Sequence, residues 1–389
     1  MTMKLMGYRR ENGQFGIRNY LLVLPTSVCA TDTAEKIAAQ IPGAIAVPNQ
    51  HGCCQIGSDE AQTERTLAGF GKNANVGAVL VVGLGCDGVQ AEQLAEDIRV
   101  AKKPVEAITI QKCGGTLKAI AAGAEIAAAM AAKLSVQERA EGDWSEIILG
   151  MECGGSDPTS GLASNPSIGY VSDKLVSMGG SSILSETTEV IGAEHLLAKR
   201  FADPAQREKF LRMVSDCEER AFRVGEDLRS GQPTPGNKAG GLSTIEEKSL
   251  GCMYKAGTSP FTGALEYAES LPLEKEGLYF MDTPGQDIDS ITGMVAGGAQ
   301  VIVFSTGRGT PTGSPIAPVI KITGNSDTFH NMPDNIDINA GRIITEGATI
   351  SQIGEELFQM MTEVCNGKRT KAEILGHREF GIYKSIGTF

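Results

Sequence analysis

The sequence lacks the features that mark membrane-inserted, secreted and nucleic-acid-binding proteins. No apolar run is long enough to cross a bilayer, and no apolar signal segment follows the first residues. The formal net charge is −12 and no basic block stands out, which excludes nucleic acid as an expected partner. We therefore predict a cytoplasmic protein that binds neither membranes nor nucleic acids. A small anionic ligand stays compatible with this charge, because a few local cations can reverse the field in one cleft.

Several motifs of common enzyme classes are also missing. No Gly-x-Gly-x-x-Gly follows the first strand-like run and no Walker A sequence occurs, so NAD and nucleoside triphosphates lack support as ligands. The Gly-x-Ser-x-Gly turn of the usual serine hydrolases is absent. There is no zinc-ribbon spacing and no Cys-x-x-Cys pair. The chemistry of this chain must therefore be sought in residues that are spread along the sequence.

The composition is that of an ordinary globular protein with an excess of glycine. The 389 residues are 41% hydrophobic and 21% charged, which suffices for two domains with sizeable cores. Forty-eight glycines predict many close turns. Nine cysteines, an odd number in a chain without a signal segment, indicate reduced thiols, of which some could be metal ligands.

Short apolar runs alternate with helical patterns through the first third of the chain. The runs at 20–25, 44–48, 78–83 and 105–110 have the continuous apolar character of strands buried on both faces. We predict an α/β protein with an N-terminal doubly wound parallel sheet of Rossmann-like type over residues 1–137, followed by a larger α/β domain over 138–389. Thiols and a histidine follow the predicted strands: Cys29, His51, Cys53, Cys54, Cys86 and Cys113. Each cysteine alone is more simply a small apolar plug, but their shared position favours a functional edge.

The loop after the strand-like run 147–150 is the centre of the second predicted domain. It brings together a carboxylate, a thiol, a hydroxyl and two glycines, in the order Glu152, Cys153, Gly154, Gly155, Ser156. Glycines allow a ligand to approach the backbone closely, and such loops at strand ends are where open α/β sheets place their sites. An ordinary strand-to-helix turn is an equally good reading of this loop taken alone.

Charged residues follow three further strand-like runs. If the segment after residue 184 is helical, Glu186 and Glu189 share one face and can act together, although acidic residues also suit any helix start. Thr306 and Arg308 follow the run 300–305, where an arginine among glycines can grip a carboxylate or sulfonate, or make a structural ion pair. Lys321 lies inside an apolar run, and buried lysines are rare without a partner or a role. Residues 229–243 are rich in Gly, Pro and Ser and form either a lid or a passive loop.

Motifs along nearly the whole chain resemble one family, which comprises altronate dehydratase, galactarate dehydratase and the large subunit of (2R)-sulfolactate sulfo-lyase. The resemblance implies a metal-dependent lyase that eliminates a β-substituent from a 2-hydroxy acid to give a 2-oxo acid. The matching motifs are Gly7-Tyr8-x-Arg10, Gly16-x-Arg18-Asn19, Asn49-Gln50-His51-Gly52-Cys53, Gly85-Cys86, Gly114-Gly115-Thr116, Glu152-Cys153-Gly154-Gly155-Ser156-Asp157, Glu186-Thr187-Thr188-Glu189, Asp282-Thr283-Pro284-Gly285, Thr306-Gly307-Arg308-Gly309 and Asp337-x-Asn339-Ala340-Gly341.

The resemblance implies roles for particular residues. Fe²⁺ is the expected ion, with Mn²⁺ or another divalent ion as alternatives. The candidate metal ligands are His51, Cys86, Glu152, Cys153 and Glu189. Glu186 and Lys321 are the candidate catalytic residues, although ligand and base cannot be separated by sequence. Substrate binding is assigned to Arg308, Gly154, Gly155, Ser156 and Thr306.

The single-chain dehydratases of this family carry a small SAF-type domain before the Gly7-Tyr8 motif, and this chain begins almost at that motif. We expect that domain on a separate small subunit, within an oligomer. This arrangement favours (2R)-3-sulfolactate, cleaved to pyruvate and sulfite, as the reaction. A sugar-acid dehydratase of altronate or galactarate type, which eliminates water, is the alternative. A scaffold subunit that only binds an anion is a second alternative.

Overall fold

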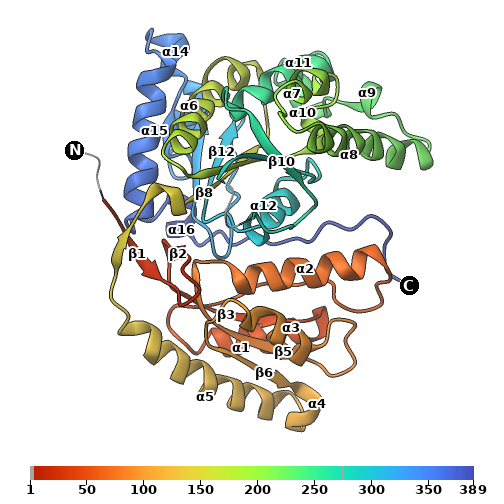
Figure 1. The fold of residues 1–389 in the computed structure, drawn as a ribbon, viewed down its shortest axis with the longest axis vertical. Helices are drawn as coiled ribbons and strands as arrows, with labels where there is room; N and C mark the ends of the chain where they lie inside the picture. The colour runs from red at the N-terminus through yellow and green to blue at the C-terminus, as the bar shows by residue number, and fades with distance from the viewer. Residues whose placement is uncertain (1–3, 273–275) are drawn as a thin grey trace.

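The computed structural model describes residues 4–272 and 276–389, which form two stacked α/β layers (Figure 1). The smaller layer contains a four-stranded sheet and the larger one a seven-stranded sheet, and all strands within each of these sheets are parallel. The predicted fold class, a doubly wound N-terminal sheet followed by a larger α/β part, is confirmed. None of the described helices is both long enough and apolar enough to cross a membrane.

The N-terminal sheet has the strand order β4-β3-β5-β6. Its strands are β3 (Tyr20–Pro25), β4 (Ala44–Ala46), β5 (Val76–Gly83) and β6 (Val105–Thr109). One face packs on α1 (Val28–Ala38) and α5 (Thr116–Ser135), and the other on α2 (Ser58–Lys72) and α3 (Ala91–Arg99). All eight residues of β5 are buried, as expected for a central strand covered on both faces. A short helix, α4 (Ile110–Cys113), follows β6.

The C-terminal sheet has the order β10-β11-β9-β8-β12-β13-β14. Its strands are β8 (Ile148–Cys153), β9 (Ser181–Leu184), β10 (Phe261–Leu265), β11 (Gly277–Met281), β12 (Val301–Thr306), β13 (Val319–Thr323) and β14 (Ile338–Asn339). From β8 the chain passes to β9 on one side, whereas β12 pairs with β8 on the other. The strand order therefore reverses at β8 and β12, and open parallel sheets bind ligands at the carboxyl end of such a point.

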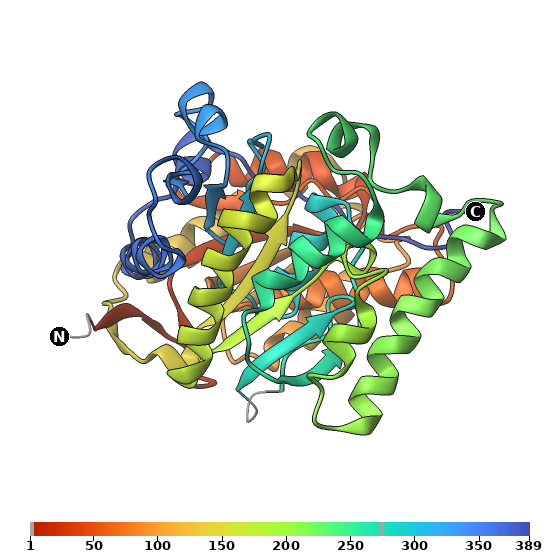
Figure 2. The same ribbon diagram turned by 90° about the horizontal axis from the view of Figure 1, so that it is seen from above.

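Helices cover both faces of the C-terminal sheet. Figure 2 shows α6 (Asn165–Ser177) and α15 (Ile350–Cys365) together on one side of the molecule, and α8 (Pro204–Arg223) on the opposite side. These three helices share one apolar core with the sheet, whereas α12 (Asp287–Ala296) packs on the other face. The remaining α-helices are short: α7 (Glu194–Ala198), α9 (Leu228–Gly231), α10 (Pro235–Ala239), α11 (Ile245–Cys252), α13 (Ser326–Asn331), α14 (Arg342–Thr345) and α16 (Lys371–Leu375).

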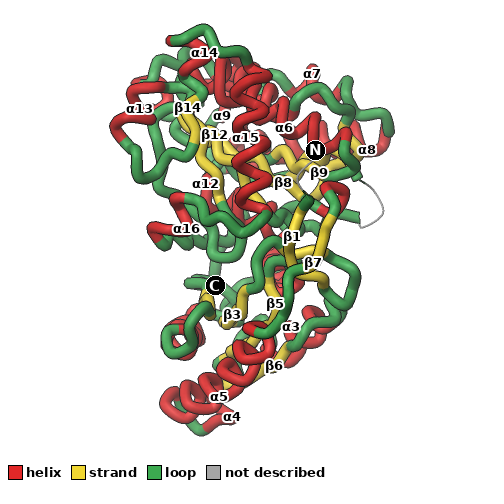
Figure 3. The backbone as a smooth tube through the Cα atoms, turned by 90° about the vertical axis from the view of Figure 1, so that its left-hand side faces the viewer, coloured by secondary structure: helices red, strands yellow, loops and turns green. Residues whose placement is uncertain are grey.

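The two layers are joined by packing and by hydrogen bonds. Helices α2 and α12 contribute to one apolar core, and the Asn75 side-chain amide donates to the carbonyls of Gln300 and Ile316 at 2.8 and 2.9 Å. A three-stranded antiparallel sheet of β2 (Phe15–Gly16), β1 (Leu5–Arg9) and β7 (Ala140–Gly142) lies beside them (Figure 3). Since apolar cores span the predicted boundary at residue 137, that division stays a prediction.

The C-terminal tail returns to the N-terminal layer. Backbone N–H groups of Ser385, Ile386 and Gly387 donate to the Asp59 carboxylate at 2.8 to 3.0 Å. The Phe389 N–H donates to the Cys54 carbonyl at 2.9 Å, so the tail lies against the loop after β4.

Candidate functional site

The loop after β8 lies at the reversal of strand order in the larger sheet. Gly155 has a φ of +60°, a conformation that side chains disfavour, and it accepts N–H bonds from Gly307 and Arg308 at 3.3 and 2.9 Å. Gly154 must also be glycine, because a Cβ there would lie 2.3 Å from an Asp287 carboxylate oxygen. The two loops after β8 and β12 are therefore fastened together, and an acid is seated directly against them.

Two buried thiols and a carboxylate converge beside this loop. Cys153 Sγ lies 3.5 Å from Cys252 Sγ, and Cys252 Sγ donates to Glu189 Oε2 at 3.1 Å. Cys153 ends β8, Glu189 ends the 3-10 turn at Thr187–Glu189, and Cys252 ends α11. One donor atom from each residue lies within 4.8 Å of the other two, and all three residues are buried. This set can chelate a metal ion.

Glu186 contacts this cluster through the backbone of Cys153. Its carboxylate accepts the Cys153 N–H at 2.9 Å and the Lys255 ammonium at 2.6 Å, and both of these ionic side chains are fully buried. Its φ is +70°, a strained conformation for this residue, held by a bond from its N–H to Thr283 Oγ1 at 2.7 Å. Burial is the main cause that raises the pKa of Glu186, and Lys255 opposes the rise. The expected helix through Glu186 is wrong, because Glu186 itself is left-handed.

A pocket of about 430 Å³ opens onto the cluster. Cys153, Gly154, Gly155, Ser156 and Glu189 line it, together with Lys248, Asp287 and Arg308. The predicted lid region over 229–243 supplies Thr234, Gly236 and Asn237. Two hydrogen bonds fix the position of this lid region. Arg308 Nη1 donates to the Gly236 carbonyl at 2.7 Å, and Asn237 Nδ2 donates to the Ser156 carbonyl at 2.9 Å. Thr306 holds the loop by accepting the Gly309 N–H at 2.9 Å.

Asp287, the first residue of α12, is the acid in this pocket that is poised to exchange protons. Burial, and next the charges of Glu186 and Glu189, raise its pKa to about 7. A carboxyl with such a pKa can be loaded and unloaded with a proton at neutral pH. Lys248 is ion-paired with Glu189, and the charge of Glu189 raises the pKa of Lys248 despite its burial, so that lysine stays cationic.

Glu152 points into a different environment from its neighbour Cys153. Its Oε2 accepts from Ser290 at 2.6 Å and from Ser185 at 3.3 Å, whereas its Oε1 has no partner among the described residues. Burial, with the charges of Glu186 and Asp287, raises its pKa well above the ordinary value. Burial therefore favours the protonated form of Glu152, and this residue does not belong to the thiol–carboxylate set.

The structure does not bring all the predicted site residues together. His51 and Cys86 lie in the loops after β4 and β5 of the smaller sheet. His51 is half-buried beside the C-terminal tail, and Cys86 is exposed. Lys321 is fully buried, as expected, but it does not line the pocket; burial lowers its pKa to about 8, and Asp337 and Glu379 are its nearest charges. These three roles stay predictions.

Four residues of the site were not anticipated from the sequence: Lys248, Cys252, Lys255 and Asp287. Three of them lie on α11 and the 3-10 turn Met253–Ala256, far from any strand end. Asp287 lies two residues beyond the motif Asp282-Thr283-Pro284-Gly285, at the start of a helix where acids are common. For Lys248 and Cys252, the packing of α11 against the 3-10 turn Thr187–Glu189 brings the side chains to the site.

The donor set fits a divalent transition metal. Two thiols and one carboxylate supply soft and hard ligands, which Fe²⁺ and Zn²⁺ both accept and which Mg²⁺ or Ca²⁺ do not prefer. The hydrogen bond with Cys252, and next burial, raise the pKa of the Cys153 thiol, so ion binding would have to displace protons. The donor set does not by itself distinguish the metal.

Comparisons with known proteins identify the family of this chain. Residues 144–388 match the sequence model described as D-galactarate/altronate dehydratase, C-terminal, and residues 7–135 match that of D-galactarate dehydratase/altronate hydrolase, second domain. The chain is 38% identical to (2R)-sulfolactate sulfo-lyase subunit beta from Chromohalobacter salexigens, over 96% of each chain. It is 35% identical to altronate dehydratase of Bacillus subtilis and 36% to that of Escherichia coli, over 97% of this chain and 77% of each relative. This chain therefore belongs to the D-galactarate/altronate dehydratase family and is an enzyme of the lyase class.

Proposed function

We propose that this enzyme removes a β-substituent from a small anionic 2-hydroxy acid and forms a 2-oxo acid, with (2R)-3-sulfolactate as the substrate. The observation that carries the proposal is the buried Cys153–Glu189–Cys252 set beside Asp287, on the floor of a pocket that also contains Arg308. Elimination needs an acidified C2 proton, a base and a grip on two anionic groups, and this pocket offers residues for each requirement.

Cys153, Glu189 and Cys252 would hold the divalent ion, for which Fe²⁺ is our first choice. When bound, the ion would supply Lewis-acid polarisation of the substrate's carboxylate and 2-hydroxyl. Lys248 and Lys255 place two positive charges beside these ligands, through their ion pairs with Glu189 and Glu186. Those charges favour the thiolate forms that binding requires.

Asp287 would act as the base. Its carboxylate takes the proton from C2, the C3–S bond breaks, and its electron pair leaves with sulfite, which yields the enol of pyruvate. The enol then tautomerises to the ketone. The raised pKa of about 7 supports this role, because the group that accepts a proton should titrate near the working pH. Glu186 is the alternative base, but its carboxylate is already paired with Lys255.

Arg308 would bind the sulfonate or the carboxylate. Its side chain is exposed and makes one bond, through Nη1 to the Gly236 carbonyl, so further N–H donors face the pocket. Gly154 and Gly155 let the substrate approach the backbone, and Ser156 adds a polar group to the wall. Lys321 stays a candidate for a later proton transfer, although it lies outside the pocket lining.

The identity to the sulfo-lyase subunit, at 38%, supports sulfolactate over a sugar acid. The identities to the altronate dehydratases, at 35 and 36%, are close, so a dehydratase that eliminates water is the second candidate. We further propose a small SAF-type partner subunit in a hetero-oligomer, because the sulfo-lyase relative is named as a subunit. The buried reduced thiols suit the cytoplasm.

The test is an anaerobic assay of the chain with ferrous iron, with and without a co-expressed small subunit. The substrates are 3-sulfolactate, altronate and galactarate, and the readouts are 2-oxo acid and sulfite. Sulfite together with pyruvate is the expected result. Oxo acid from a sugar acid alone would transfer the chain to the dehydratases. No product from any of them, with iron bound and the partner present, would contradict the proposed reaction and leave the substrate of this lyase open.

A further inference from the structure

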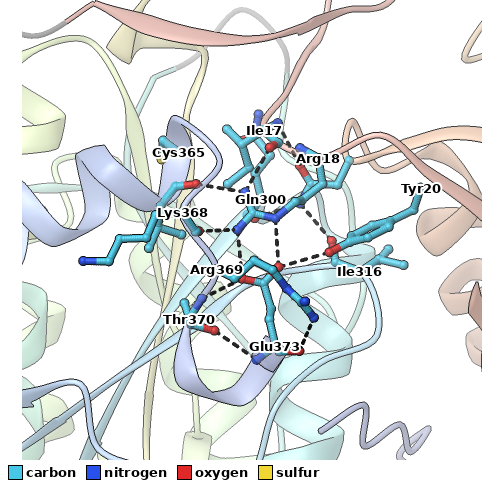
Figure 4. A network of polar contacts seen from close by, with 12 residues as sticks. Ile17, Arg18, Tyr20, Gln300, Ile316, Cys365, Lys368, Arg369, Thr370 and Glu373 are labelled. Atoms are coloured by element: carbon cyan, nitrogen blue, oxygen red, sulfur yellow. Dashed lines mark hydrogen bonds and ion pairs between the residues drawn. The ribbon is translucent and has the colours of Figure 1, made fainter. Parts of the chain in front are cut away.

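A second pocket of about 430 Å³ lies between the two layers, and it shares no lining residue with the first. Its walls come from the start of the chain, with Tyr8 of β1, from Arg139 near β7, and from the C-terminal segments that follow α15 and α16. Figure 4 shows one wall, where Arg18, Tyr20 and Arg369 gather around Glu373. The pocket is therefore built by segments that are far apart in sequence.

The charge of this pocket is opposite to that of the protein. Its lining contains four arginines and one carboxylate, Glu373, within a chain of net charge −12. The arginines are Arg18, Arg139, Arg369 and Arg378. Glu373 is fully engaged by Arg18, whose Nε and Nη2 donate to its two oxygens at 2.8 Å each. Three guanidinium groups thus face the pocket without a counter-ion among its lining residues. An anion from solution would find a strongly favourable field here.

The three remaining arginines have N–H donors to spare. Arg378 makes no hydrogen bond or ion pair with any described residue. Arg369 uses Nη2 for the Glu373 carbonyl, and Arg139 uses Nε and Nη2 for carbonyls of Met6 and Cys365. The Nη1 groups of Arg139 and Arg369 stay unbonded within the described chain. Planar, forked donors of this type match phosphate and carboxylate oxygens.

An unsatisfied hydroxyl on the wall is an independent sign of a ligand. Ser314 is 6% exposed, lines this pocket, and its Oγ has no hydrogen-bond partner among the described residues. A buried hydroxyl without a partner is costly, and most such groups in proteins are bonded. A ligand oxygen or an ordered water in the pocket would satisfy it.

We propose that this pocket binds a small polyanion with at least two phosphate or carboxylate groups. Arg139, Arg369 and Arg378 hold the anionic groups, and Ser314 Oγ donates to one of their oxygens. The ligand contacts both the start of the chain and its C-terminal segments, so its binding holds the two layers together. This site is independent of the proposed lyase reaction, because no residue of the first pocket contributes to it.

The test is a calorimetric titration at low ionic strength, combined with thermal unfolding. Inorganic pyrophosphate probes a phosphate ligand. Propane-1,2,3-tricarboxylate probes a carboxylate ligand, and it lacks the 2-hydroxyl of the proposed substrate. We expect one molecule of at least one probe per chain, a rise in Tm, and affinity that falls with added salt. The Arg369→Gln/Arg378→Gln variant should bind on the order of tenfold to a hundredfold more weakly, and Ser314→Ala less markedly so.

Two matched variants make the result decisive. Arg212→Gln removes an exposed arginine of α8, and it should leave the affinity for the probe unchanged. Arg308→Gln alters the first pocket, and it should also leave this affinity unchanged. Loss of probe binding in Arg308→Gln would place the anion in the first pocket and overturn the proposal. The proposal would also be overturned if neither probe bound, or if the Arg369→Gln/Arg378→Gln variant bound a probe as tightly as the unaltered protein does.

Discussion

The carboxyl edges of the two parallel sheets carry the same types of residue but surround them differently. The edge of the N-terminal sheet presents Cys29, Cys54 and Cys86 to solvent, and its loops are tied by Asp87, which binds Ser27 and two backbone N–H groups. At the edge of the C-terminal sheet the thiols of Cys153 and Cys252 are buried. The two edges thus differ in the burial of their thiols and in the buried charges that surround Cys153 and Cys252.

The difference comes from what packs over each edge. Over the C-terminal sheet, α11 brings Lys248 and Cys252 onto the loops after β8 and β9, and burial raises the pKa values of Glu152, Glu186 and Asp287. In the N-terminal sheet, the C-terminal tail covers Asp59, whose pKa stays below its usual range because three backbone N–H groups outweigh its burial. The C-terminal edge therefore offers buried acids and thiols for the proposed proton and metal chemistry, whereas hydrogen bonds to Asp59 and Asp87 hold the N-terminal edge.

The sharpest way to break this comparison is to remove one thiol from each edge. Cys252→Ser should lower metal content and reduce kcat by about 1,000-fold, because Lewis-acid polarisation is worth several kcal/mol. The matched control is Cys29→Ser, which removes an exposed thiol from the N-terminal edge. This variant should keep its metal content and its kcat. Metal analysis and the lyase assay give the result. If Cys86→Ser lost the metal and Cys252→Ser kept it, the metal site would lie in the N-terminal layer, where two of the five predicted ligands, His51 and Cys86, are found.

Asp287 offers the second largest effect. Asp287→Asn should lower kcat about 100-fold with metal content unchanged, since a positioned base contributes at least that much. In the unaltered enzyme kcat should rise with pH as Asp287 loses its proton, with a midpoint at or below about 7 because a bound cation favours the carboxylate. This rise of kcat with pH should be absent in Asp287→Asn.

Asp289→Asn is the control for this prediction, because Asp289 lies on the same helix and its pKa is also raised by burial. It does not line the pocket and should preserve the pH profile. A normal profile in Asp287→Asn, with its loss in Glu186→Gln instead, would transfer the role of base to Glu186.

Arg308 sharpens the comparison by testing the substrate rather than the metal. Arg308→Gln should raise KM about tenfold and change kcat less, since it removes charge-assisted bonds that both substrate and transition state use. Arg223→Gln, at an exposed position on α8, is the matched control and should change neither constant. An unchanged KM in Arg308→Gln would mean that the anion binds elsewhere.

Much of this architecture could be read from the sequence, and the limits have physical causes. The strands β3, β5 and β6 lie on the predicted apolar runs at 20–25, 78–83 and 105–110, because strands buried on both faces have little choice of residue type. Cys153 and Glu189 follow strand-like runs, and the family resemblance marked them as metal ligands. Cys252 was not, because it ends a helix and only tertiary packing brings it within 3.5 Å of Cys153. His51 and Cys86 satisfied the same strand-end rule, but they lie in the other layer.

The smallest predicted effect is on stability, and it tests the burial of Asp287 without any activity. The folded pKa of about 7 lies above the ordinary value, so folding favours the protonated acid. As pH rises from about 4 through 7, the folded chain loses stability, because ionisation must then occur in a buried site. Asn imitates the neutral acid and escapes this loss. Asp287→Asn should therefore raise Tm by several degrees at about pH 8, in protein depleted of divalent ions, and by little at about pH 4. If Asp287→Asn and the unaltered protein had the same Tm at pH 8 as well as at pH 4, Asp287 would be solvated. The argument that its raised pKa suits it as the base would then fail.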